Sequence, residues 1–233
     1  MFDDFFGKFS RAFLENNFSG LRLMADGLKN TILITLGALL LGVILGTILA
    51  VAKVLPTKNI FNKILAGIAN VYIAVFRGTP VVVQLLLFYF GICAKIDIDP
   101  VLAAVICLGM NSGAYVAEII RSGILAVDHG QMEAGRSLGL TYSTTLIRIV
   151  LPQAIKNILP ALGNELIALI KETSVVSFIT VVDITKVAGN IIAKTYEPFV
   201  PYLFLALIYL VIVLFATWLV GILERRMRQS DQR

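Results

Sequence analysis

The chain alternates between long apolar runs and shorter segments that carry most of its charge. Three of these runs contain no charged residue: 30–52, 100–117 and 198–223. A helix needs about 20 mostly apolar residues to cross a membrane, because no water is present there to satisfy its backbone polar groups. The pattern therefore predicts a transmembrane helix in each of these three runs.

Residues 64–94 form a fourth apolar run, which is too long for one straight crossing. Gly78 and Pro80 interrupt it. Proline favours the first turn of a new helix, so a kink is expected at this point. We expect 64–76 to lie near one membrane interface and 79–94 to be the main crossing.

A fifth run, 155–180, is rich in Leu, Ile, Ala and Val although it contains Glu165, Lys171 and Glu172. With it, the chain is predicted to be an all-α integral membrane protein. One transmembrane domain is expected over 1–233, with five spans at about 30–52, 64–94 (kinked), 99–120, 155–180 and 198–223.

Composition narrows the possible classes of protein. The chain is 58% hydrophobic and 15% charged, with a mean hydropathy of +0.88, whereas a soluble domain has about 45–50% apolar and about 25% charged residues. This excludes a water-soluble globule and a disordered chain. In such an apolar chain, the net charge of +5 sets membrane orientation more often than it binds nucleic acid. With the C-terminus inside, inner segments hold 11 Lys and Arg residues and outer segments 7, so we expect an outside N-terminus and a cytoplasmic C-terminus.

Near the N-terminus, phenylalanines recur at helical spacing. This pattern fits a short helix lying in the membrane interface and, equally well, an ordinary packed aromatic face. The residues are Phe2, Phe5, Phe6, Phe9 and Phe13. The two cysteines, Cys93 and Cys107, lie inside apolar runs and are expected to be small core residues.

The segment 122–153 is too long for a simple turn and is the most polar stretch of the chain. Glycines and prolines divide it into short amphipathic helical patterns, one of them over 132–138. Gly139 allows a sharp turn after that pattern. Long loops are uncommon in compact domains and usually have a function or act as linkers. This loop is therefore either a helix that presents one face to another protein or a solvated connector.

A spaced motif in this loop resembles the EAA loop of ABC importer membrane subunits. The matching residues are Glu133-Ala134-Gly135, Gly139, Ile149, Leu151 and Pro152, with Gly135 where the family usually has Ala. Further segments look like those of polar amino-acid importers, so that the resemblance covers about 25–225. They are Phe76 to Pro80 with Gln84, Gly113 to Arg121, Gly130-Gln131, Leu159-Pro160, Gly163 to Glu165, and Lys171 to Ser174.

The resemblance implies a permease subunit with the type I ABC importer fold, multi-pass in a bacterial inner membrane. Its implied partners are two ABC ATP-binding subunits, a second permease copy or paralogue, an extracytoplasmic amino-acid-binding protein and the lipid bilayer, with no nucleic acid. The implied cytoplasmic coupling helix would dock on the ATP-binding subunit, which binds ATP and Mg²⁺, so that this chain needs no cofactor. The coupling residues would be Glu133, Ala134, Gly135, Arg136, Leu138 and Gly139.

Polar side chains inside the predicted spans are the candidates for the translocation path. A charged side chain at mid-membrane costs about 2.5–3.5 kcal/mol on insertion scales, which invites a partner or a wet cavity. One helical stripe carries an amide, two carboxylates and an ammonium: Asn164, Glu165, Lys171 and Glu172. The stripe either lines a path for a zwitterion, with Glu165 meeting an ammonium and Asn164 a carboxylate, or forms an internal salt-bridge cluster.

A structural role is one of two alternatives for two further polar residues and is expected for one further polar pair. Asn111 and Gln84 could line the path or act as hydrogen-bonding contacts between helices. Glu118 and Arg121 are i,i+3 neighbours and are expected to form a structural pair.

The chain offers little for catalysis. A single histidine, His129, excludes a His-ligated metal cluster, and no Gly-x4-Gly-Lys-Ser/Thr loop is present to bind ATP. The sequence therefore predicts a non-enzymatic permease of an ATP-driven importer. An alternative is an ion-coupled secondary carrier with Glu165 and Lys171 as a proton relay, although five spans without an inverted repeat argue against it. An intramembrane enzyme lacks a credible nucleophile–base pair.

Overall fold

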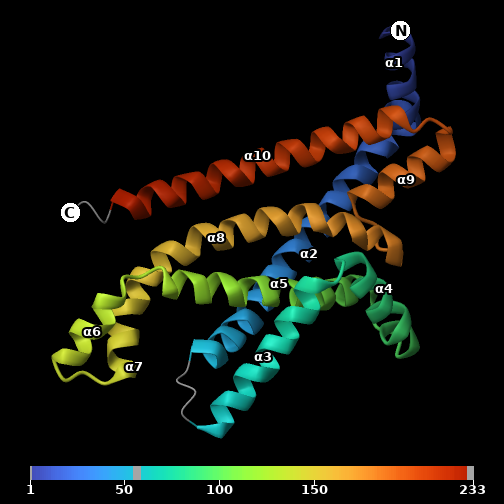
Figure 1. Cartoon of the computed structure of the whole chain (residues 1–233). Helices are drawn as coiled ribbons and strands as arrows, with labels where there is room; N and C mark the ends of the chain where they lie inside the picture. The colour runs from blue at the N-terminus through green and yellow to red at the C-terminus, as the bar shows by residue number, and fades with distance from the viewer. Residues whose placement is uncertain (1, 55–58, 230–233) are drawn as a thin grey trace. The chain divides into compact units, whose positions relative to one another are not determined.

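The computed structural model describes residues 2–54 and 59–229, which are helical nearly throughout and contain no strand (Figure 1). Five helical segments are long and apolar enough to cross a membrane, as predicted: Ser19–Val54, Ile60–Gly78, Pro100–Leu125, Tyr142–Ile179 and Phe199–Met227. The α-helices are α1 (Phe2–Phe9), α2 (Glu15–Val54), α3 (Ile60–Gly78), α4 (Val81–Gly91), α5 (Pro100–Leu125), α6 (His129–Ser137), α7 (Tyr142–Thr145), α8 (Leu151–Glu172), α9 (Ile184–Thr195) and α10 (Phe199–Gln229). Two π-helical turns, Ser10–Leu14 and Leu146–Val150, and two 3-10 helices, Cys93–Lys95 and Thr173–Ile179, lie between them.

The fourth predicted run breaks where expected, but the two sides differ from the prediction. α3 ends at Gly78, and Pro80 caps α4 in an extended conformation. It is α3, with 19 residues, that is long enough to cross, whereas α4 has only 11. The expectation that 79–94 is the main crossing is therefore corrected, because α4 already stops at Gly91.

The helix that contains the span predicted at 155–180 begins and ends differently from the prediction. The helix does not begin anew after Pro152 but continues from Tyr142 through a π-helical turn. A π turn is one way in which a helix accommodates a proline, which has no N–H to donate. At the other end, the α-helix stops at Glu172 and the 3-10 helix continues to Ile179.

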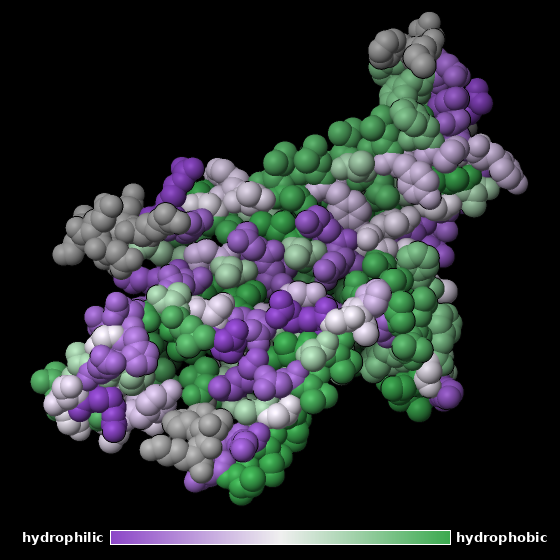
Figure 2. All heavy atoms as spheres, viewed as in Figure 1, coloured by the Kyte–Doolittle hydropathy of each residue, from purple (hydrophilic) through white to green (hydrophobic). Residues whose placement is uncertain are grey.

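The described residues form two compact units that share the long helices. The first comprises 1–38, 80–108 and 168–216. The second comprises 39–79, 109–167 and 217–233. Exposed apolar side chains are plentiful on the spans, as expected of a surface that faces lipid, and Figure 2 shows apolar residues over α4 and many polar ones around α6 and α7.

The core of the first unit joins the N-terminal aromatic residues to α9 and α10. Phe13 is fully buried, and its ring centroid lies 5.0 Å from that of Phe9 and 4.6 Å from that of Phe204. Phe9 and Phe13 thus belong to a packed aromatic face, whereas Phe6 is 69% exposed. The side chain of Phe2 lies outside the described residues.

Helix α9 was not predicted. It buries Val187, Ala188 and Ile191 in the same core. Asp183 caps its first turn by accepting hydrogen bonds from the backbone N–H groups of Thr185 and Lys186. Such a short helix escapes a search for membrane-spanning runs.

The second unit depends on glycines that let α2 and α5 approach closely. Gly42 and Gly46 are four residues apart on α2, as Gly109 and Gly113 are on α5. A Cβ added to Gly46 would lie 2.6 Å from side-chain atoms of Val116. Small residues spaced in this way allow helix backbones to pack tightly in membranes.

Candidate functional site

The short helix α6 is fixed at both ends by local sequence signals. The Asp128 carboxylate accepts a hydrogen bond from the N–H of Gly130 at 2.7 Å, which satisfies one of the free donors of the first turn. At the other end Gly139 has a φ of +83°, a conformation that favours glycine, and the next N–H, of Leu140, donates to the carbonyl of Gly135. The predicted helix in the 122–153 loop therefore exists and has sharply defined ends. Figure 1 shows α6 and α7 side by side, near the end of α5 and the beginning of α8.

One face of α6 is packed and the other is free to meet a partner. Gly135 is buried, and a Cβ there would lie 2.4 Å from Cγ2 of Thr145. On the exposed side, the Glu133 side chain is 71% exposed and contacts Nδ1 of His129 at 3.2 Å, and Leu138 is 81% exposed.

Ala134 and Arg136 are exposed as well, and the Arg136 guanidinium donates to the carbonyl of Leu140 at 3.2 Å. An apolar tip beside a carboxylate and a guanidinium is an arrangement suited to recognition of another protein.

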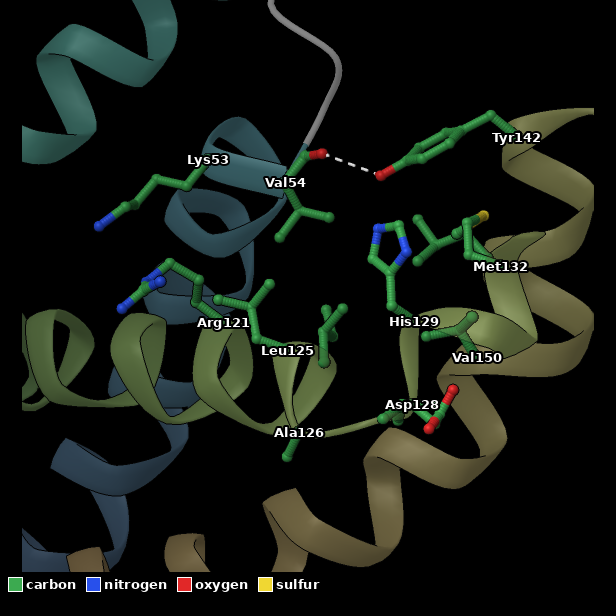
Figure 3. A pocket seen from close by; sticks show the side chains of 13 residues that line it. Lys53, Val54, Arg121, Leu125, Ala126, Asp128, His129, Met132, Tyr142 and Val150 are labelled. Carbon is green, nitrogen blue, oxygen red and sulfur yellow. Dashed lines mark hydrogen bonds between the residues drawn. The ribbon is translucent and has the colours of Figure 1, made fainter.

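The end of α2 is tied to the loop that carries α6. The Tyr142 hydroxyl donates to the carbonyl of Val54 at 3.2 Å, and this carbonyl is one of the four that the end of an α-helix leaves without a partner. Figure 3 shows this bond at the edge of a pocket of about 540 Å³. The pocket lies among the ends of α2 and α5, α6 and α7, and its lining includes Lys53, Arg121, His129 and Met132.

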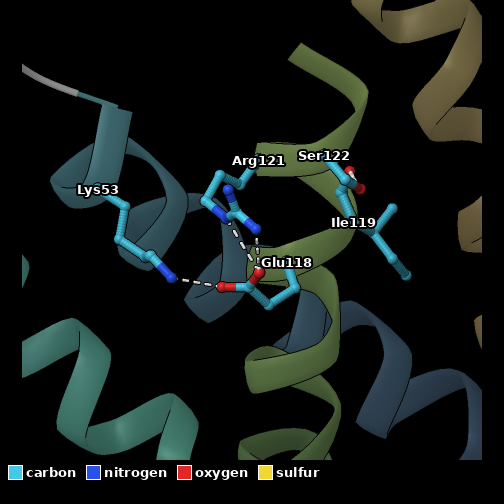
Figure 4. Close-up of polar contacts among 5 residues, drawn as sticks. All are labelled: Lys53, Glu118, Ile119, Arg121 and Ser122. Carbon is cyan, nitrogen blue, oxygen red and sulfur yellow. Dashed lines mark hydrogen bonds and ion pairs between the residues drawn. The ribbon is translucent and has the colours of Figure 1, made fainter. Parts of the chain in front are cut away.

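A charge cluster ties α2 to α5 as well (Figure 4). The Glu118 carboxylate accepts two hydrogen bonds from the Arg121 guanidinium, at 2.9 and 2.8 Å, and its other oxygen pairs with the Lys53 ammonium. The predicted pair of Glu118 and Arg121 is confirmed. The sequence analysis did not predict that Lys53 pairs with Glu118. A signal was available, because Lys53 directly follows the first predicted span, on the same predicted side of the membrane as the end of the span that holds Glu118.

Inside the second unit, Glu165 is half-buried and accepts a hydrogen bond from the Ser112 hydroxyl at 2.7 Å. The sequence analysis named Glu165 as a candidate for the path but did not identify Ser112 as its partner. Asn164, the next residue on α8, is exposed. The structure therefore places a carboxylate on α8 against α5, with its Oε1 oriented by a hydroxyl group.

Asn111 has a different environment. It is only 3% exposed, and its amide donates to the carbonyl of Phe76 at 3.3 Å. The Tyr72 hydroxyl donates in the opposite direction, to the carbonyl of Met110 at 2.7 Å. These bonds join α3 to α5, which is the helix–helix contact expected as one of the two alternatives for Asn111.

The remaining path candidates belong to the first unit. Lys171 is exposed and Glu172 half-buried at the end of α8, and Gln84 is half-buried on α4. The structure thus brings Glu165 together with Ser112 in the second unit.

Sequence comparisons give a consistent assignment. A family model described as "Binding-protein-dependent transport system inner membrane component" matches residues 38–229. The chain is 41% identical over 208 residues to the arginine transport system permease protein ArtQ of Bacillus subtilis, covering 88% of this chain and 93% of that protein. It is 38% identical over 204 residues to a putative glutamine transport system permease protein, GlnP, of Rickettsia typhi, covering 87% and 91%.

Solved structures are similar along most of the chain. A crystal structure of an amino acid ABC transporter with histidines superposes with a TM-score of 0.82 at 45% identity, covering 88% of this chain and 94% of the other. An inward-facing structure of the methionine ABC transporter MetNI superposes with a TM-score of 0.76 at 19% identity, covering 88% and 96%. The second likeness concerns the fold alone.

Proposed function

Since this chain belongs to the family of binding-protein-dependent transport system inner membrane components, we propose that it forms the membrane pathway of an importer for polar amino acids. Energy would come from two separate ATP-binding subunits, which hold the ATP and Mg²⁺. A second permease copy or paralogue and an extracytoplasmic amino-acid-binding protein complete the assembly. The N-terminus lies outside and the C-terminus in the cytoplasm.

The observation that carries this proposal is the exposed face of α6. A helix with defined caps, with Glu133 and Leu138 turned outward, is a ready-made contact for a cytoplasmic ATPase. Its other face packs through Gly135 on the segment that begins with α7, so that a push on α6 moves both elements together.

Two contacts would carry such a push into the spans. The bond from Tyr142 to the carbonyl of Val54 joins α7 to the end of α2, and the Glu118 cluster joins α2 to α5. Packed helices respond to such a load by rigid-body rotation or sliding rather than by continuous deformation. The resulting motion would open the pathway alternately to each side of the membrane.

For the substrate, we propose that Glu165 meets the ammonium of the amino acid. A hydrogen bond from Ser112 fixes one oxygen of this carboxylate on the wall of α8. Asn164, beside it on the same helix, can donate to a carboxylate. Lys171, Glu172, Gln84 and Asn111 stay predictions for the same path.

The coupling role is tested by Glu133→Lys in the complex with its ATPase subunits. Charge reversal in the centre of the exposed face should make the ATPase dissociate during purification, while the spans stay folded. Lys63→Glu, a charge reversal on the exposed first turn of α3, is the matched control and should retain the ATPase. Retention by the Glu133 variant would contradict the proposal.

Uptake into proteoliposomes separates this proposal from the ion-coupled carrier. An importer needs enclosed ATP and ignores a pH gradient. Uptake that follows the gradient without ATP would establish the carrier and overturn the importer.

The role of Glu165 is tested by Glu165→Gln. If its carboxylate meets the ammonium that all amino acids share, uptake of arginine, glutamine and cystine should fall by similar factors. A loss confined to arginine would show that the residue reads the side chain instead. No loss for any of the three would remove Glu165 from the path.

A further inference from the structure

An apolar groove runs between α1 and the beginning of α10, within the first unit. Its larger part has a volume of about 590 Å³, and a smaller part of about 230 Å³ shares several of its lining residues. Apolar side chains from both helices form the walls: Phe5, Phe6, Phe199, Val200, Leu203 and Leu207. Figure 2 shows that α1 is apolar on one side and polar on the other.

The groove follows the first turns of a predicted membrane span. From Phe199 to Leu207, α10 rises by about 12 Å, roughly two-fifths of the hydrocarbon core of a bilayer. Phe6 and Phe199 are 69% and 65% exposed beside it. Because α10 is a candidate membrane span that begins at Phe199, a groove along its first turns adjoins the region where lipid headgroups meet acyl chains.

Three charged side chains also line the larger part of the groove and form its charged rim. The Lys8 ammonium lies 3.2 Å from Oδ2 of Asp4 and 3.1 Å from Oε2 of Glu197. The hydrogen bonds to Glu197 and Asp4 raise the pKa of Lys8, so that it stays protonated. Two carboxylates facing one ammonium leave a net charge of about −1 at the rim.

We propose that this groove is a binding site for a glycerophospholipid whose headgroup carries a primary ammonium. The acyl chain lies along α10, the lipid phosphate meets Lys8, and the headgroup ammonium donates hydrogen bonds to Asp4 and Glu197. A quaternary ammonium has no N–H to donate, and a headgroup with a net negative charge meets the acidic rim unfavourably. The rim thus selects phosphatidylethanolamine over phosphatidylcholine and phosphatidylglycerol. This proposal needs only the membrane location of the chain and is independent of the substrate and of ATP coupling.

Native mass spectrometry of the full complex from nanodiscs tests the selectivity. The nanodiscs contain equal parts of the three lipids. Wild type should retain phosphatidylethanolamine, and the double variant Asp4→Asn/Glu197→Gln should lose about five- to tenfold of this preference, as expected for the loss of charge-assisted contacts at a partly exposed site. Asp97→Asn, an exposed acidic residue elsewhere in the first unit, is the matched control. Equal retention of all three lipids by wild type, or an unchanged preference in the double variant, would overturn the proposal.

Fluorescence places the lipid in the groove. Trp218→Phe/Phe6→Trp puts the single tryptophan of the chain in the wall of the groove, where brominated acyl chains quench it on contact. Quenching should be several-fold stronger with brominated phosphatidylethanolamine than with brominated phosphatidylcholine. Equal quenching would overturn the proposal. So would efficient disulfide crosslinking of Phe6→Cys between two chains, since the groove would then be filled by a second copy.

Discussion

Replacing Gly135 with alanine tests how α6 is joined to the membrane helices. This position is alanine in the usual form of the EAA motif, so the change looks harmless by sequence. The structure predicts a steric clash instead, because the new Cβ would lie 2.4 Å from Cγ2 and 2.9 Å from Oγ1 of Thr145. Thr145 is fully buried, and its hydroxyl donates to the carbonyl of Thr141 at 3.0 Å, which fixes the side chain.

The expected magnitude is a balance of two effects. Alanine in a helix is about 1 kcal/mol more favourable than glycine. Overpacking against a fixed side chain costs about 1–3 kcal/mol. The free energy of unfolding should therefore fall by roughly 1 kcal/mol, with the loss concentrated in α6. In Gly135→Ala/Thr145→Ala the clash with Thr145 disappears, and only the contact of 3.2 Å with Cδ1 of Ile149 remains. The coupling between the two substitutions should therefore be favourable by about 1–3 kcal/mol.

Hydrogen–deuterium exchange of the α6 amides is the direct assay, with thermal unfolding of the detergent-solubilised complex beside it. A loss of 1 kcal/mol corresponds to a Tm lower by about 2–4 °C for a domain of this size. Gly189→Ala on α9 is the control, because nothing lies within 4 Å of its added Cβ and it should gain stability. Slower exchange in α6 of the Gly135 variant, with Thr145 intact, would refute the packing argument.

Three further predictions follow from single contacts. Gly46→Leu should destabilise the complex by about 3 kcal/mol or more, because even a Cβ at this position would lie 2.6 Å from side-chain atoms of Val116. The measurement is a lower Tm. Gly67→Leu is the control and should leave the Tm unchanged, because nothing lies within 4 Å of a Cβ at Gly67. Tyr142→Phe removes the hydrogen bond to the carbonyl of Val54 and should lower the amount of substrate imported per ATP hydrolysed, with the ATPase still bound; an unchanged ratio would exclude this route. Burial raises the pKa of Asp183, so the folded protein holds the proton on this carboxyl more tightly than the unfolded chain does. The stability gained in this way is fully present below the unfolded-state pKa of about 3.9, and it is lost as the pH rises through the raised pKa. Asp183→Asn should flatten this decline in a Tm series between pH 4 and pH 7.

The fold was largely predictable because length and hydropathy determine which segments can cross a membrane. Five spans follow from that rule alone. The rule fails at Gly78–Pro80, because it cannot tell which side of a break is the crossing when both sides are apolar. It is also blind to α9, which is too short to span and buries its apolar face inside the protein.

Local signals predicted a helix over 132–138 and the turn at Gly139, because a glycine with positive φ acts within a few residues of the helix end. They missed the start of α6 at His129, after the Asp128 cap. Contacts between residues far apart in the sequence were not predictable in this way. Tyr142 and Val54 are 88 residues apart, Lys53 and Glu118 are 65 apart, and Ser112 and Glu165 are 53 apart. Only the packing of α2, α5 and α8 brings such pairs together. The predicted topology still narrows the search, since a polar side chain within a span is costly unless it finds a partner at the same depth on another span.

The same reasoning explains why Glu118 belongs to a cluster of charges near the ends of α2 and α5. Glu118 would be costly in an apolar helix on its own, and the Arg121 guanidinium one turn away satisfies only one of its oxygens. Lys53 occupies the other, from the last turn of α2. Because Val54, the next residue, accepts from Tyr142, the position that neutralises a charge in α5 adjoins the position that receives α7. If α6 moves and α2 does not follow, either the ion pair between Lys53 and Glu118 or the hydrogen bond from Tyr142 to the carbonyl of Val54 must break. These two contacts therefore transmit a movement of α6 to the spans.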